Sequence, residues 1–223
     1  MIKQKEFEQI NRSCGLMSPT KAIASGNHKM PMSHVILNIT SATDCPSDKL
    51  GYCHCSIQCY AKLEEIRWKT VRNNRQIIQQ FFRDCTYEQL RDLVFGYINL
   101  YQLEYPITHL RVNECGDFPN QKWVQWIDEL AKELSGSGIV IYCWTARKDL
   151  DFSNVSFIVN ASNVGVKHSS RLFLATKQEV FDRLEVGKHE HKCPGNCRIC
   201  NVCRSKNDIT KVYCRMHSSK ARV

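Results

Sequence analysis

The chain has 223 residues, a formal net charge of +9 and 13 cysteines. This length suits one sizeable domain, or a domain with a small appendage. A content of 43% hydrophobic and 24% charged residues argues against disorder. No apolar run approaches the roughly 20 residues of a membrane-spanning helix, and the segment MIKQKEFEQINRSCG lacks the apolar centre of a signal peptide. We therefore expect a cytoplasmic protein that has no membrane partner.

The N-terminal half is predicted to contain one strand and a long helical region. The expected segments are a helix over 3–11, a loop over 20–33, a strand over 34–40 and helices over 61–101, with breaks near Asn73–Asn74 and near Asp84. Thr86 and Gln89 have the spacing of a capping box, which predicts the start of the last of these helices.

From residue 107 onwards, predicted strands and helices alternate. They are strands over 107–114, 139–144, 155–162 and 171–176, and helices over 120–138 and 177–185. Such alternation implies a parallel sheet, and about five strands predict a partial, open β/α barrel of the α/β class rather than a complete eight-stranded barrel. We expect two parts, the partial barrel over 1–187 and a cysteine-rich, metal-binding appendage over 188–223.

Nine of the cysteines lie in two groups. The first group is Cys45, Cys53, Cys55 and Cys59, and the second is Cys193, Cys197, Cys200, Cys203 and Cys214. Because cytosolic thiols are kept reduced, clustered cysteines indicate metal binding rather than disulfides. The scattered cysteines are expected to be small core residues; they are Cys14, Cys85, Cys115 and Cys143.

Three motifs resemble a known family. The stretch NITSATDCPSDKLGYCHCSIQCYAKLEE is similar to the signature of bacteriophage Gene 88 proteins and of related phage radical-SAM-like proteins. The segments LRVNECGDFPNQKWVQWIDELAKEL, with Cys115 where the family usually has serine, and CPGNCRICNVC resemble two further family segments. The resemblance implies an iron–sulfur protein with a radical-SAM-like partial barrel. The first cysteine group would then lie after the first strand, at the carboxyl end of the barrel, where such folds place their chemistry.

The resemblance also implies which residues bind the cofactors. Cys45, Cys55 and Cys59 would hold a [4Fe–4S] cluster with one open iron site, which radical SAM enzymes use to bind and cleave S-adenosylmethionine (SAM). Gly116 and Asp117 would hold the SAM amino group. The spacing Cys-x9-Cys-x3-Cys departs from the usual Cys-x3-Cys-x2-Cys of such sites. Zinc is the alternative metal, and it would use four of the set Cys45, Cys53, His54, Cys55 and Cys59.

The C-terminal group resembles ferredoxin-type cysteine runs and predicts a second [4Fe–4S] cluster with a structural or electron-relay role. Its ligands would be Cys193, Cys197, Cys200 and Cys203. A zinc-finger-like set of Cys200, Cys203, Cys214 and His217 is the alternative. In either case the appendage is expected to need its metal to fold. His189 and His191 are expected to be solvated histidines rather than ligands.

The positive charge makes nucleic acid a candidate partner. Several basic residues follow the first cysteine group and form either a solvated face or a phosphate-binding surface; they are Lys62, Arg67, Lys69, Arg72 and Arg75. Trp68, Phe81 and Phe82 are expected in the core. No catalytic side chain is predicted.

We therefore predict a radical-SAM-like enzyme that initiates radical modification of an unknown substrate in the host cytoplasm. The alternative is a non-catalytic iron–sulfur protein that binds nucleic acid or a host protein and uses its clusters for structure or redox sensing. A zinc-stabilised binding module is the third hypothesis.

Overall fold

The computed structural model describes residues 2–54 and 59–215. The described helices are α1 (Gln4–Ser13), α2 (Pro46–Lys49), α3 (Tyr60–Arg67), α4 (Lys69–Asp84), α5 (Tyr87–Gln102), α6 (Gln121–Ser135), α7 (Gln178–Arg183) and the 3-10 helix η2 (Val202–Arg204). The described strands are β1 (Ile23–Ser25), β2 (His34–Leu37), β3 (His109–Val112), β4 (Val140–Thr145), β5 (Ile158–Ala161), β6 (Arg171–Thr176), β7 (Glu190–Lys192) and β8 (Lys211–Arg215).

The strands form one eight-stranded sheet in the order β1-β2-β3-β4-β5-β6-β8-β7. Only the β1–β2 pair is antiparallel among the described strands, and every other neighbouring pair is parallel. The sheet is open, with β1 and β7 as its edges. The α/β class and the open sheet are thus as predicted. The sheet does not by itself establish a radical-SAM barrel.

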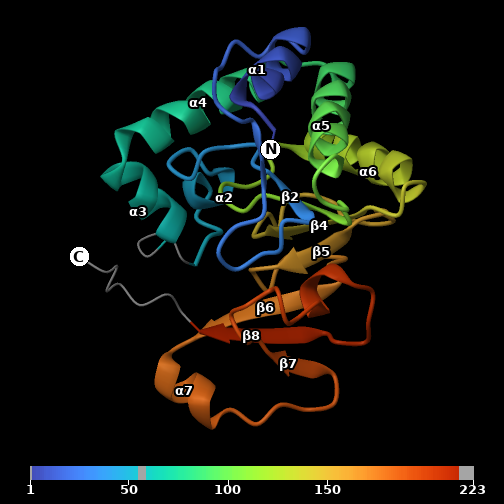
Figure 1. The fold of residues 1–223 in the computed structure, drawn as a ribbon. Coiled ribbons are helices and arrows are strands. Elements are labelled where there is room, and N and C mark those ends of the chain that lie inside the picture. Colours follow the sequence, from blue (N-terminus) through green and yellow to red (C-terminus); the bar gives the residue numbers. More distant parts are fainter. Residues whose placement is uncertain (1, 55–58, 216–223) are drawn as a thin grey trace.

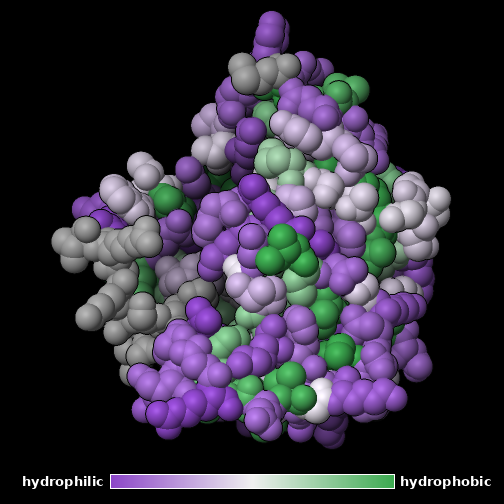
Figure 2. Space-filling model, turned by 60° about the horizontal axis from the view of Figure 1, so that its bottom comes forward, coloured by the Kyte–Doolittle hydropathy of each residue, from purple (hydrophilic) through white to green (hydrophobic). Residues whose placement is uncertain are grey.

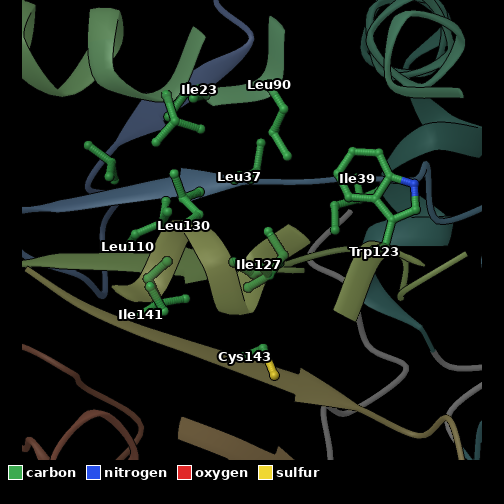
Figure 3. Packing of buried hydrophobic residues seen from close by; sticks show 14 of the residues in the cluster. Ile23, Leu37, Ile39, Leu90, Leu110, Trp123, Ile127, Leu130, Ile141 and Cys143 are labelled. Atoms are coloured by element: carbon green, nitrogen blue, oxygen red, sulfur yellow. The ribbon is translucent and has the colours of Figure 1, made fainter. Parts of the chain in front are cut away.

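The helices gather on one side of the central strands. Figure 1 shows α1, α4, α5 and α6 above β2 to β5, while β6, β8 and β7 extend the sheet away from them. Alternate strand residues face the helices, among them Leu37, Leu110 and Ile141, which lie in the main hydrophobic core (Figure 3). The predicted apolar face of α6 is confirmed, because Trp123, Ile127, Leu130 and Leu134 are all buried.

Two helix starts are fixed by side-chain caps. Thr86 and Gln89 form the predicted capping box of α5: the Gln89 N–H donates to Thr86 Oγ1 (3.3 Å) and the Thr86 N–H donates to Gln89 Oε1 (2.9 Å). At α6, the Trp123 N–H donates to Asn120 Oδ1 (3.3 Å). These caps satisfy backbone donors that the first turn leaves unpaired.

Some predicted boundaries were wrong. The long helical region breaks at Trp68, whose extended backbone separates α3 from α4, and not at Asn73–Asn74. Trp68 is 54% exposed and so is not a core residue, whereas Phe82 is buried and Phe81 packs against the core as predicted. The predicted loop over 20–33 contains the short edge strand β1.

The C-terminal part extends the sheet. Strand β8 pairs with β6 from Leu172↔Lys211 to Thr176↔Arg215, and β7 pairs with β8. Figure 2 turns this end of the molecule forward and shows a mainly hydrophilic surface with scattered hydrophobic side chains. Among the described helices, none is both long and apolar enough to span a bilayer.

Candidate functional site

The first cysteine group lies at the carboxyl edge of the parallel strands. Strand β2 ends at Leu37, and the chain then passes through Cys45, α2 and Cys53 before α3 begins after Cys59. Because the carboxyl ends of β2 to β5 meet at this edge, the loop lies where open α/β sheets bind ligands. Cys55, a predicted ligand, and residues 56–58 fall outside the described residues.

A buried glutamate fixes the start of this loop. Glu65 on α3 is fully buried and accepts hydrogen bonds from the Ala42 N–H (2.7 Å), the Thr43 N–H (2.8 Å) and the Thr43 hydroxyl (2.8 Å). Arg75 Nη1 lies 3.1 Å from the same carboxylate. A buried charge with this many donors holds the segment before Cys45 against α3 and α4.

Asp117 holds the other side of the loop. Its carboxylate is buried and accepts hydrogen bonds from Ser47 Oγ (2.6 Å), the Ala146 N–H (2.9 Å) and the Phe118 N–H (2.8 Å). Burial raises the pKa of Asp117, although the hydrogen bond from Ser47 acts in the opposite direction. The structure therefore gives this carboxylate partners in the protein itself, and binding of the SAM amino group stays a prediction.

Gly116 is required where the chain passes Thr40. It has φ +70°, and a Cβ at this position would overlap the carbonyl oxygen of Thr40. The Thr40 hydroxyl bridges the backbone of Asp117, since it accepts from the Asp117 N–H (3.0 Å) and lies 3.0 Å from the Asp117 carbonyl oxygen. Gly116 and Asp117 thus join the ends of β2 and β3.

The described thiols of the first group are half-buried and free of disulfides; they are Cys45, Cys53 and Cys59. Burial, together with the charges of Asp117 and Cys53, raises the pKa of Cys45 to about 12. Lys62 donates to Asp48 (2.7 Å), which raises the lysine pKa, and the charges of Cys59 and Cys45 add to this effect. Lys62 therefore lies close enough to Cys45 and Cys59 for their charges to interact.

The C-terminal group also comes together. Cys193 follows β7, and its N–H donates to the Tyr213 carbonyl (2.8 Å). Burial raises the pKa of Cys203, and the charges of Cys193, Cys200 and Cys197 raise it further, so the four predicted ligands are electrostatic neighbours. The structure thus places the predicted set of four in one loop region.

Two additional side chains lie beside this group. His191 is half-buried and its Nε2 is 3.4 Å from Cys200 Sγ, and the expectation that it is not a ligand stays a prediction. Burial, together with the charge of Cys193, raises the pKa of Cys214 to about 11. His217, the last member of the alternative zinc set, lies outside the described residues. The sequence signal for His191 was its position two residues before Cys193.

Neither group forms a finished coordination sphere. Within residues 2–54 and 59–215, no three Cys, His, Asp or Glu side chains converge closely enough to hold a metal ion. No cysteine in this part of the chain forms a disulfide. The structure therefore brings soft sulfur donors near one another without completing a metal site. The argument for a metal depends on the preference of soft thiolates for zinc and for iron–sulfur clusters.

Polar residues of the sheet dock the C-terminal loop. Asn160 is fully buried on β5, and its Nδ2 donates to the carbonyls of Cys203 (3.0 Å) and Cys143 (2.8 Å). Arg171 on β6 donates from Nη1 to Asn160 Oδ1 (3.2 Å) and from Nη2 to the Ser205 carbonyl (2.9 Å). Sequence reasoning missed this role, although an asparagine within the apolar run VSFIVNAS was a signal.

A histidine pair lies on the same face of the sheet. His34 and His109 stack with ring centroids 4.5 Å apart, and His34 Nδ1 is 3.0 Å from the Tyr142 hydroxyl. Burial lowers the pKa of His34 to about 3 and that of His109 to about 4, and the positive charge of Arg204 contributes to both shifts. Both imidazoles are neutral at pH 7, and sequence reasoning had not singled out either.

An open parallel sheet with one cysteine loop at its carboxyl edge and another docked on its face defines a cysteine-rich α/β protein. The family model described as Gene product 88 matches residues 16–164, which is more than half of the chain, so the chain belongs to this family. The match includes the first cysteine group and Gly116–Asp117 and ends before Cys193. The predicted Gene 88 membership is therefore confirmed. Comparisons with curated proteins and with solved structures found no match.

Proposed function

We propose that this Gene product 88 protein is an iron–sulfur protein of radical-SAM-like type, with one [4Fe–4S] cluster at each cysteine group. The observation that carries the proposal is that four C-terminal thiols without disulfides lie close enough for their charges to interact at Cys203; these are Cys193, Cys197, Cys200 and Cys203. Thiols held together in a reducing compartment are typical of metal and cluster sites.

The surroundings of the C-terminal thiols suit an anionic centre. The positive charge of Arg171 favours the thiolate of Cys203, and that of Lys29 favours the thiolate of Cys193. The Gly195 N–H donates to Cys193 Sγ (3.4 Å). A cluster with four thiolates carries about two negative charges, and nearby cations and N–H donors stabilise such a centre.

At the first group, the resemblance assigns Cys45, Cys55 and Cys59 as ligands. These three thiolates would hold three irons of a [4Fe–4S] cluster and leave the fourth for SAM, and the cluster would supply the electron that splits SAM into methionine and a 5′-deoxyadenosyl radical. The protein's own contribution is to order the loop, with Glu65 on one side and Asp117 on the other. The substrate is unknown, and the net charge of +9 makes nucleic acid a candidate.

A second hypothesis is a non-catalytic protein that uses its clusters for structure or redox sensing. It is favoured by Asp117, whose carboxylate already accepts hydrogen bonds from Ser47, Ala146 and Phe118. A zinc site is the third hypothesis, and the contact between His191 and Cys200 favours it, because zinc readily takes mixed Cys and His ligands.

The test is SAM cleavage by anaerobically purified protein. Dithionite and SAM are expected to yield 5′-deoxyadenosine, and Cys45→Ser is expected to abolish the product. Cys214→Ser is the matched control, since Cys214 lies in neither assigned ligand set, and it should retain the product. An iron-loaded protein that gives neither product nor a spectral change with SAM would favour the non-catalytic hypothesis.

A further inference from the structure

Asn113 is an unusual residue at the carboxyl end of β3. It has a left-handed backbone with φ +60°, and it is only 3% exposed. Its N–H donates to the Leu37 carbonyl (2.9 Å), but neither side-chain amide atom has a hydrogen-bond partner in the described part of the chain. Buried polar atoms in proteins are nearly always paired, so this side chain needs an explanation.

The turn itself does not explain the asparagine. Glycine adopts φ +60° without strain, and the chain uses glycine in this way three residues later, at Gly116. A buried unpaired amide costs about 1–3 kcal/mol. The side chain of Asn113 offers one acceptor and two donors, so it is equipped to recognise a ligand.

Arg111 also has a buried polar side-chain atom without a hydrogen-bond partner in the described part of the chain. It lies two residues before Asn113 in the chain, and its pairing with Tyr142 places it on the face of the sheet that carries Trp144. The Arg111 guanidinium lies 4.5 Å from the Trp144 ring centroid, and its Nε has no partner among the described residues. Its Nη1 makes only long contacts, to Glu114 Oε1 (3.5 Å) and Met30 Sδ (3.4 Å).

A second cation, Arg204, acts on the same side chains as Arg111. Arg204 and Arg111 both lower the pKa of His34, and Arg204 also lowers that of His109. Tyr142 lies beside His34, and Glu114 is the carboxylate that approaches Arg111, at 3.5 Å. A guanidinium that has only long contacts to its partners attracts an anion.

Space for a small molecule is lined by neighbours of Arg111 and Asn113 rather than by these two residues themselves. A pocket of about 270 Å³ is lined by Glu114, which follows Asn113 in the chain, and by Asn38. Asn38 is the neighbour of Asn113 on β2, because Leu37 pairs with Val112. Lys21 adds positive charge to the pocket wall, whereas Arg75, also in the wall, is paired with Glu64 and Glu65. Its volume is close to the lower end of the range for small-molecule sites.

We propose that Arg111 and Asn113 recognise a small anion, a carboxylate or a phosphate, at the carboxyl end of β3. Arg111 binds the anionic oxygens, and the Asn113 amide pairs with an anionic oxygen or with a neighbouring polar group of the same molecule. This site does not rest on the proposed cluster chemistry, so either proposal can fail without the other.

The experiment measures binding of inorganic phosphate and of acetate to the full chain, purified anaerobically. Titration calorimetry and thermal unfolding are compared with sodium chloride at equal ionic strength. One of the two anions is expected to raise Tm in a concentration-dependent way, and which anion does so identifies the ligand chemistry.

Asn113→Gly is the decisive variant because glycine keeps the backbone conformation and removes only the amide. It is expected to fold, to be at least as stable as the wild type, and to bind the responding anion at least tenfold more weakly. Asn154→Gly is the matched control, since Asn154 is exposed and has φ +59°, and it should bind as the wild type does. Arg111→Lys should weaken binding as well.

Three results would overturn the proposal. The first is that neither anion shifts Tm or gives binding heat with the wild type. The second is an Asn113→Gly variant that binds with unchanged affinity. The third is an Asn113→Gly variant that is clearly less stable than the wild type, because this would show that the amide already has a structural partner.

Discussion

Acidification is predicted to destabilise the protein through the neutral histidine pair on the sheet face. His34 is 1% exposed, stacks on His109 and faces Tyr142, Arg111 and Arg204. Burial lowers its pKa from the ordinary 6.5 to about 3, so the unfolded chain takes up a proton in this pH range and the folded chain does not. The contribution of neutral His34 to the free energy of unfolding is fully present above pH 6.5. This contribution is lost as the pH falls from 6.5 toward 3.

The magnitude follows from the pKa difference. One pKa unit corresponds to about 1.4 kcal/mol. At pH 5 the unfolded histidine is mostly protonated, so His34 alone should lower the free energy of unfolding by about 2 kcal/mol relative to pH 7. His109, with a pKa of about 4, acts in the same direction.

The assay is urea unfolding at pH 7 and at pH 5 for the wild type, His34→Gln and His189→Gln. His34→Gln should be less stable than the wild type at pH 7, because it loses the ring stacking, but its loss between pH 7 and pH 5 should be about 2 kcal/mol smaller. His189, with its side chain 53% exposed, is the control and should match the wild type. An identical pH dependence in His34→Gln and the wild type would refute the reasoning.

Three further predictions concern the loops that carry the cysteines, and urea unfolding measures each. Asn160→Ala leaves the carbonyls of Cys203 and Cys143 without their donor and should cost about 3 kcal/mol; a cost below about 1 kcal/mol would show that Asn160 does not dock the loop. Gly116→Ala should lower the free energy of unfolding by well over about 2 kcal/mol, because the added Cβ overlaps Thr40. Gly138→Ala is the control: Gly138 has φ +71° but open space around the added Cβ, so its cost should be only about 1–2 kcal/mol. Equal costs would exclude the overlap with Thr40. Glu65→Ala should lower the free energy of unfolding by about 3 kcal/mol, because the loop before Cys45 loses its buried acceptor. It should also lower the cluster content of the first group. A variant with full cluster content and unchanged stability would contradict this role.

Local rules predicted most of the elements. The strand predicted over 171–176 matches β6 at both ends, and the capping box of Thr86 placed the start of α5 correctly. The helix over 120–138 was right in position and in its buried face, since its apolar spacing and its cap agree. These features depend on neighbouring residues, so a single sequence is enough to reveal them.

Long-range features were not predictable in the same way. Strands β7 and β8 lie in a polar, cysteine-rich stretch, and their pairing with β6 is decided by partners distant in the chain. The exposure of Trp68 follows from a helix break that the apolar pattern did not reveal. The orphan amide of Asn113 becomes visible only when all of its neighbours are in place.

Metal analysis of the anaerobically purified protein tests the central claim most directly. Two [4Fe–4S] clusters predict a brown protein with about eight iron and eight sulfide ions per chain. Cys45→Ser and Cys200→Ser should each lower both counts by about half, and Cys214→Ser should leave them unchanged. A colourless protein that holds zinc or no metal, and whose metal content does not change in the Cys45 and Cys200 variants, would contradict the claim.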